Sequence, residues 1–109
     1  MKQLDSQVWV SPQIQPEDVA GLAAQGFTAV ICNRPDGEEP GQPLFADVEA
    51  AAKANGMTVT FLPMTSRDVT PEQAAEFAKV LSATDGKVFA YCRSGARCEA
   101  IWSAAKARV

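Results

Sequence analysis

Ala90-Tyr91-Cys92-Arg93-Ser94-Gly95-Ala96-Arg97-Cys98 joins an apolar segment to a segment with helical periodicity. Val88 to Tyr91 predicts a buried strand, and Ile101, Ala104 and Ala105 recur at the spacing of one helix face. A tight loop between a strand and a helix is therefore expected. Backbone N–H groups in such a loop can converge on an anion, and the helix that follows adds the positive end of its dipole.

Cys92 opens this loop, where amides and the helix dipole would stabilise a thiolate. We expect its pKa to fall from about 8.5 to between about 4 and 7, which makes the sulfur a nucleophile at neutral pH. Arg97 closes the loop and Arg93 adds a second cation, and the planar guanidinium fork suits an oxyanion. In the alternative, Cys92 only ends a strand and Arg97 is a solvated surface residue.

The rest of the chain alternates between predicted strands and helices. Strands are expected at residues 7–10, 27–32, 58–62 and 88–91, and helices from Pro16 to Gly26, from Phe45 to Asn55 and after the Thr70–Gln73 capping box. This order predicts an α/β fold with a mostly parallel central sheet and helices on both faces. The loops after residues 32, 62 and 91 would meet on one edge of the sheet. The final helix shows no capping signal before Val109, so we expect it to fray there or the chain to continue.

Composition narrows the class of protein further. A chain of 109 residues with 47% hydrophobic residues fits a single globular domain spanning residues 1–109. The net charge of −3 argues against nucleic acid or an anionic membrane as a partner. Three cysteines do not suggest a secreted disulfide framework, so we expect a reducing cytoplasm. Without histidine, a zinc site is not expected, and neither a metal nor a cofactor is predicted.

Three stretches resemble one known family. Asn33-Arg34-Pro35-Asp36-Gly37-Glu38-Glu39, Leu62-Pro63-Met64 and Tyr91-Cys92-Arg93-Ser94-Gly95 look like the phosphatase-like domain of beta-lactamase-hydrolase-like proteins. The resemblance implies a fold like that of tyrosine and dual-specificity phosphatases. The loop itself also resembles rhodanese-like sulfurtransferases, which open with Cys-Arg-x-Gly and have a loop one residue shorter than phosphatases. Some family members are fused to a persulfide-processing metallo-hydrolase, which the resemblance implies as a partner.

Three departures from the phosphatase pattern favour sulfur transfer. Only four residues separate Cys92 from Arg97, Tyr91 stands where phosphatases have histidine, and Cys98 stands where they have Ser or Thr. We therefore predict a sulfurtransferase that takes sulfur from thiosulfate or a small persulfide onto Cys92 and passes it to an acceptor thiol. A phosphatase with a phosphocysteine intermediate is the alternative, and a non-catalytic module that binds an anion or a partner protein is the third hypothesis.

The remaining candidates have weaker signals. The amides of Ser94, Gly95 and Ala96 would hold the anion, together with Arg93. Asp68 is the only carboxylate in the loop at residues 63–68, so it would be the general acid of a phosphatase. Arg34 would contact substrate, pair with Asp36 or brace the loops at the sheet edge. Cys98 shares a helix face with Ile101, which predicts buried packing rather than a resolving thiol, and Cys32 is expected to be structural.

Overall fold

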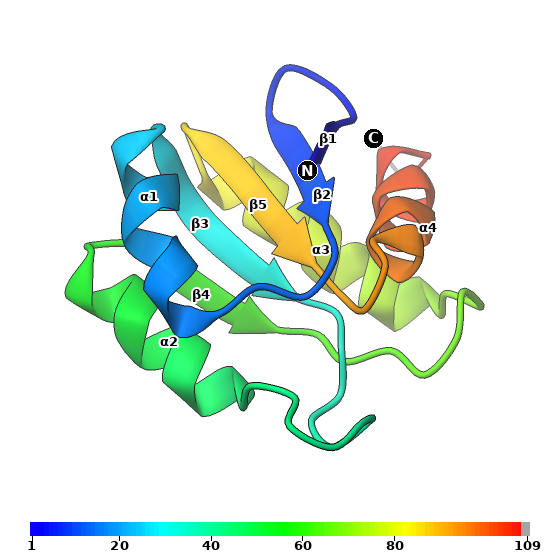
Figure 1. The fold of residues 1–109 in the computed structure, drawn as a ribbon. Coiled ribbons are helices and arrows are strands. Elements are labelled where there is room, and N and C mark those ends of the chain that lie inside the picture. The colour runs from blue at the N-terminus through cyan, green and yellow to red at the C-terminus, as the bar shows by residue number, and fades with distance from the viewer. Residues whose placement is uncertain (108–109) are drawn as a thin grey trace.

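Five strands form one sheet in the computed structural model, which describes residues 1–107 (Figure 1). In spatial order they are β1 (Lys2–Gln3), β2 (Val8–Ser11), β5 (Lys87–Tyr91), β3 (Phe27–Cys32) and β4 (Thr58–Phe61). The pairs β2–β5, β5–β3 and β3–β4 are parallel. The prediction of a mostly parallel sheet is confirmed, and β5, which leads into the cysteine loop, lies at its centre.

One strand was not expected. Lys2–Gln3 forms β1, which pairs antiparallel with β2 through Lys2–Val10 and Gln3–Trp9. Its residues are polar and exposed, so no hydrophobic alternation marks them as a strand.

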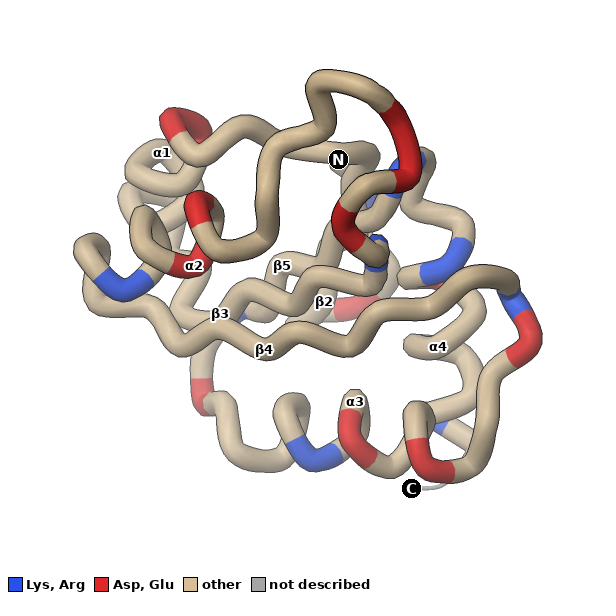
Figure 2. The backbone as a smooth tube through the Cα atoms, turned by 90° about the horizontal axis from the view of Figure 1, so that it is seen from below, with Lys and Arg blue, Asp and Glu red and all other residues tan. Residues whose placement is uncertain are grey.

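Helices cover both faces of the sheet, as predicted. The helical elements are the 3₁₀ turn η1 (Pro16–Asp18), α1 (Val19–Ala24), α2 (Phe45–Ala54), α3 (Pro71–Ala83) and α4 (Ala96–Lys106). Figure 2 shows α1 and α2 on one side of the sheet and α3 and α4 on the other. Val19 and Val48 join the core on the first side, and Phe77 and Ile101 join the core on the second.

The start of α3 follows from its sequence. Thr70 accepts a hydrogen bond from the Gln73 amide at 3.1 Å, and the Gln73 side chain accepts one from the Thr70 amide at 2.9 Å. This is the predicted capping box, with Pro71 in the first helical position. The two capping hydrogen bonds and Pro71 therefore fix the residue at which α3 begins, independently of its packing on the sheet.

The carboxyl ends of the parallel strands meet at one edge of the sheet. Tyr91 pairs in register with Ser11 on one side and Cys32 on the other, and Cys32 pairs with Phe61. The chain leaves β3 and β5 side by side, because the Asn33 amide donates to the Tyr91 carbonyl at 2.9 Å. The loops that follow β3, β4 and β5 therefore converge, as the alternation of strands and helices predicts.

None of the helices among residues 1–107 combines the length and apolar character needed to cross a membrane. The expected fraying or continuation at Val109 lies outside the described residues.

Candidate active site

Gly95 makes the turn between β5 and α4. Its φ of 97° lies in the left-handed region that glycine tolerates, and it occupies the N-cap position of α4. A Cβ at this position would lie 3.6 Å from the backbone of Ser11. In this conformation the Gly95 amide donates to the Cys92 sulfur at 3.0 Å. A larger residue here would strain the backbone, and that strain would disturb the hydrogen bond to the sulfur.

Cys92 is buried and its sulfur is surrounded by hydrogen-bond donors. The Cys98 side chain, followed by the amides of Cys98, Gly95 and Ser94, lowers the pKa of Cys92 to about 4 against the opposing effect of burial. A thiol with this pKa is ionised at neutral pH. The structure therefore gives Cys92 the protonation state that a nucleophile requires.

Cys98 does more than fill space. It lies buried on the face of α4 that also buries Ile101 and Ala105, as predicted. Burial and the hydrogen bond with Cys92 raise the pKa of Cys98 well above its usual value, so its thiol keeps its proton and donates to the thiolate. Cys98 thus donates a hydrogen bond to the thiolate from the position where phosphatases have Ser or Thr. All three cysteines are free in the structure.

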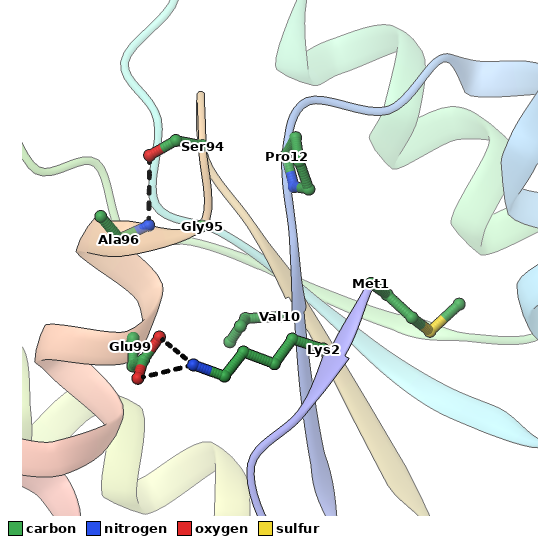
Figure 3. A pocket seen from close by; sticks show the side chains of 8 residues that line it. All are labelled: Met1, Lys2, Val10, Pro12, Ser94, Gly95, Ala96 and Glu99. Atoms are coloured by element: carbon green, nitrogen blue, oxygen red, sulfur yellow. Dashed lines mark hydrogen bonds and ion pairs between the residues drawn. The ribbon is translucent and has the colours of Figure 1, made fainter.

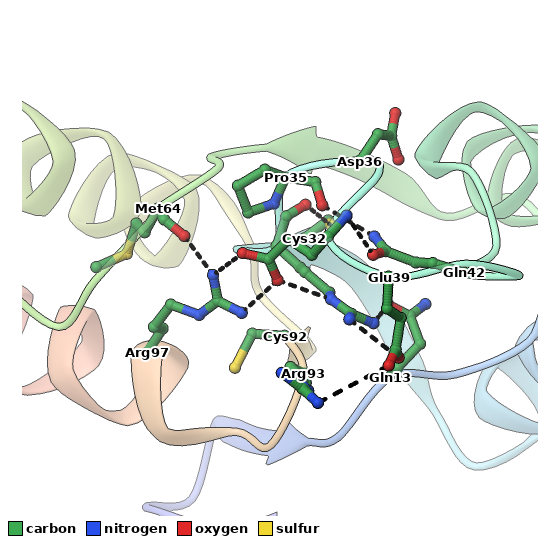
Figure 4. A network of polar contacts seen from close by, with 12 residues as sticks. Gln13, Cys32, Pro35, Asp36, Glu39, Gln42, Met64, Cys92, Arg93 and Arg97 are labelled. Carbon is green, nitrogen blue, oxygen red and sulfur yellow. Dashed lines mark hydrogen bonds and ion pairs between the residues drawn. The ribbon is translucent and has the colours of Figure 1, made fainter.

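Arg97 is held at two of its three nitrogens. Nη1 donates to Glu38 Oε2 at 2.7 Å and to the Met64 carbonyl at 2.6 Å, and Nη2 donates to Glu38 Oε1 at 2.7 Å. A guanidinium carries five N–H donors, so Nε–H and one Nη2–H stay free of these contacts. The Arg97 side chain also reaches the Cys92 sulfur by a hydrogen bond. Figure 4 shows Arg97 beside Cys92, so its guanidinium is placed to contact both the sulfur and an anion bound next to it.

Glu38 is the site residue that sequence reasoning missed. Besides Arg97, it accepts a hydrogen bond from Arg34 Nε at 2.9 Å. The hydrogen bond from Arg97, and then that from Arg34, lowers the pKa of Glu38 to about 2, although burial opposes the shift. Glu38 is therefore ionised at neutral pH, and it positions Arg97 rather than supplying a proton.

Arg34 braces the loop after β3 and does not reach solvent. Its side chain is fully buried, and it also donates to Gln13 at 3.1 Å and to Glu39 at 3.1 Å. The alternative of a pair with Asp36 is not the one observed: Asp36 Oδ1 accepts from the Phe45 amide at the start of α2 at 2.8 Å. Of the roles considered for Arg34, the bracing role fits its burial.

Arg93 and Asp68 are exposed. The Arg93 side chain is 66% accessible and its nearest carboxylate is Glu39, at 3.8 Å. The Asp68 amide donates to Ser66 Oγ at 3.1 Å, and within residues 1–107 no hydrogen bond or ion pair engages the Asp68 carboxylate. Arg93 therefore borders the mouth of the loop, whereas nothing in the described chain aims Asp68 at Cys92.

A hollow opens on the outer side of the loop (Figure 3). It has a volume of about 260 Å³ and is lined by Lys2, Ser94, Gly95, Ala96 and Glu99, among others. Lys2 and Glu99 form an ion pair across it at 3.2 Å, and Ser94 Oγ accepts from the Ala96 amide at 3.3 Å. The hollow thus reaches the outer side of the loop at Ser94, Gly95 and Ala96.

A parallel sheet whose central strand leads through a cysteine loop into an arginine-bearing helix defines the cysteine-phosphatase-like class of fold. The chain belongs to the family described as "Beta-lactamase hydrolase-like protein, phosphatase-like domain", which matches residues 1–109. This confirms the resemblance seen in the sequence and the predicted fold.

Two curated relatives are both called "Beta-lactamase hydrolase-like protein". The protein from Agrobacterium fabrum is 36% identical over 94 residues, and the protein from Xylella fastidiosa is 31% identical over 94 residues. In each case the match covers 86% of this chain and 22% of the relative. The chain therefore spans about a fifth of the length of these relatives.

Two solved structures are similar to this one. The "putative phosphatase" of Neisseria meningitidis has a TM-score of 0.83 and 35% identity, over 93% of this chain and 72% of that one. The protein described as "Tk-PTP in the active form" has a TM-score of 0.69 and 19% identity, over 98% of this chain and 83% of that one. The second likeness shows the fold alone.

The reactivity of Cys92 should depend on pH as its low pKa dictates. We expect the rate of alkylation by neutral iodoacetamide to stay flat from about pH 6 to 8 and to fall below about pH 5, as a thiolate with a lowered pKa becomes protonated. Cys98→Ala, which removes the first of the stabilising donors, should move this titration to higher pH, whereas Cys98→Ser should retain most of the shift. Mass spectrometry of the alkylated peptide measures the rate, and a wild-type midpoint above pH 8 would contradict the thiolate assignment.

Proposed function

We propose that this domain is a cysteine-dependent group-transfer enzyme that acts on a small anionic substrate. Cys92 is the nucleophile, and Arg97 and the amides of Ser94, Gly95 and Ala96 hold the anion. The observation that carries this proposal is the ionised Cys92 sulfur, held by loop amides next to the Arg97 guanidinium. A module that only bound a partner would have no need of a buried thiolate, because an isolated buried charge is costly.

We propose sulfur as the group transferred. The Cys92 thiolate attacks the outer sulfur of thiosulfate or a small persulfide and forms a new S–S bond. The S–S bond of the donor breaks, and its electron pair leaves with sulfite or with a thiolate. An acceptor thiolate then removes the outer sulfur and restores the Cys92 thiolate. Neither step requires a proton donor.

The carboxylates of the site support this choice. A phosphatase needs an acid that protonates the leaving oxygen. Glu38, the carboxylate held at the site, has a pKa of about 2 and is paired with two arginines, so it cannot give up a proton at neutral pH. Asp68 is exposed. The loop is also short, with four residues between Cys92 and Arg97, and three amides point at the sulfur itself.

Phosphoryl transfer is the second candidate, and the comparisons support it more directly than they support sulfur transfer. The family is described as phosphatase-like, and the solved relative at 35% identity is called a "putative phosphatase". The Cys98 thiol also supplies a donor that would help the Cys92 thiolate leave a phosphocysteine. In this mechanism Asp68 is the general acid.

The relatives suggest where such an enzyme would act. They are longer and are named as hydrolase-like proteins, so we propose a persulfide-processing metallo-hydrolase as a partner that uses the transferred sulfur. Three free cysteines, one of them a thiolate, fit a reducing compartment, and we propose the cytoplasm.

Asp68→Asn separates the two candidates. If sulfur is transferred, we expect the substitution to change the rate less than about twofold, because no acid takes part. If phosphate is transferred, loss of the general acid should slow the turnover of an aryl phosphate by about 10²-fold or more. Both assays are run on both proteins, with Asp85→Asn, at the turn before β5, as the control. Phosphate turnover that depends on Asp68, without sulfur transfer, would overturn the sulfur proposal.

A further inference from the structure

Every arginine at the mouth of the loop already has a carboxylate partner. Arg97 pairs with Glu38 at 2.7 Å, and buried Arg34 pairs with Glu38 at 2.9 Å and with Glu39 at 3.1 Å. Arg93 faces Glu39 at 3.8 Å. Figure 4 shows Arg97, Arg93 and Glu39 of this chain of alternating charges around Cys92. We refer to Glu38 and Glu39 as the carboxylate brace.

The brace removes the excess positive charge of the site. Three guanidinium groups face two carboxylates and the Cys92 thiolate, so their charges cancel. Nearby groups add no net positive charge. Asp36 contributes a further negative charge, and its repulsion helps to raise the pKa values of Cys32 and Tyr91.

The positive and negative charges on the neighbouring surface are also equal in number. The Lys2–Glu99 pair crosses the hollow beside the loop, and Arg67, which lines a second hollow with Glu99, is followed in the chain by Asp68. These four residues carry two charges of each sign. The described chain therefore surrounds Cys92 with a nearly neutral rim rather than with a positive field.

What the site retains is directional donors. The amides of Ser94 and Gly95 already donate to the Cys92 sulfur, so the Arg97 guanidinium beside it and the start of α4 are left to solvate one negative charge on a ligand. A second charge on the same ligand would find no unpaired cation and would face the thiolate and the brace, at a cost set by Coulomb repulsion.

We propose that the carboxylate brace makes the site selective for a donor with a single negative charge at its reacting end, and that this donor is an organic persulfide rather than the dianion thiosulfate. The proposal rests on the proposed sulfur transfer. In the reaction, Cys92–S⁻ attacks the outer sulfur of R–S–S⁻, the S–S bond of the donor breaks, and R–S⁻ leaves with the electron pair of that bond. Cys92–S–S⁻ remains, so charge and atoms balance.

Glu39→Gln tests this because Glu39 is partly exposed and its loss frees Arg93 while Arg97 keeps Glu38. Loading of sulfur onto Cys92 is followed by intact mass, with an alkyl persulfide or thiosulfate at equal ionic strength. We expect the wild type to load at least tenfold faster from the alkyl persulfide. The variant should load from thiosulfate about three to ten times faster than the wild type, with a smaller gain for the persulfide. Glu49→Gln, on α2, is the matched control.

A second readout does not depend on sulfur transfer. Protection of Cys92 from iodoacetamide by inorganic phosphate near pH 8, where phosphate is a dianion, should be weak in the wild type and several-fold stronger in Glu39→Gln. If neither donor loads Cys92 but this protection changes, the sulfur proposal fails and the charge selection stands. Equal loading from both donors, or phosphate protection unaffected by Glu39→Gln, would overturn the charge selection.

Discussion

Replacing Cys92 with serine is expected to lower kcat/KM for group transfer at least about a thousandfold. A serine hydroxyl stays protonated at neutral pH, whereas the amides of Ser94 and Gly95 and the thiol of Cys98 are arranged around an anion. The substitution therefore removes both the nucleophile and the charge that these donors stabilise. Steady-state assays with sulfur donors and with an aryl phosphate measure the loss.

The fold should survive this change, because serine and cysteine differ little in size and Cys92 lies at the end of the strand-to-helix loop. Thermal unfolding followed by circular dichroism provides the control. A folded Cys92→Ser protein that retained a tenth of the wild-type rate would show that the reaction does not pass through Cys92.

Arg97→Lys is expected to cost about 10²- to 10³-fold in kcat/KM, the range seen when one preorganised donor to a developing charge is removed. Lysine keeps the charge but lacks the planar guanidinium, which donates two parallel hydrogen bonds to Glu38 while it also faces Cys92 and the substrate. Activity with the same donors measures the effect. Arg67→Lys, in the exposed loop after β4, is the matched control and should change the rate less than twofold.

The Arg97 substitution also tests the role of Glu38. If Glu38 acts by positioning Arg97, Glu38→Gln should lower the rate through the same step, and adding it to Arg97→Lys should cost little more. Independent, additive losses from the two changes would contradict a positioning role.

Local sequence signals predicted the elements that carry the site. Phe27–Cys32 forms a strand with the predicted bounds, because a nearly continuous apolar run is typical of a strand buried on both faces. The Thr70–Gln73 box fixes the start of α3, and the position of Gly95 between Cys92 and Arg97 marks the turn. Each of these signals lies within a few residues of the feature that it predicts.

The parts that were missed depend on contacts between distant residues. Glu38 binds Arg97 across a separation of 59 residues, and it lies in a proline- and glycine-rich segment whose path the sequence does not fix. The signal that could have indicated Glu38 is the pair of adjacent glutamates at the end of residues 33–39, the first of the stretches that resemble the family. The contact of Cys98 with Cys92 was missed because helix periodicity assigns a residue to the core and does not say which core atom it touches.

The most direct test of the account is the intact mass of the protein after incubation with an alkyl persulfide or thiosulfate. The account predicts a gain of one sulfur atom that an added thiol removes and that Cys92→Ser does not show. No gain with either donor, together with turnover of an aryl phosphate that requires Cys92, would contradict sulfur transfer and favour the phosphatase. No gain, no turnover and slow alkylation of Cys92 at neutral pH would contradict the central claim that Cys92 is a catalytic thiolate.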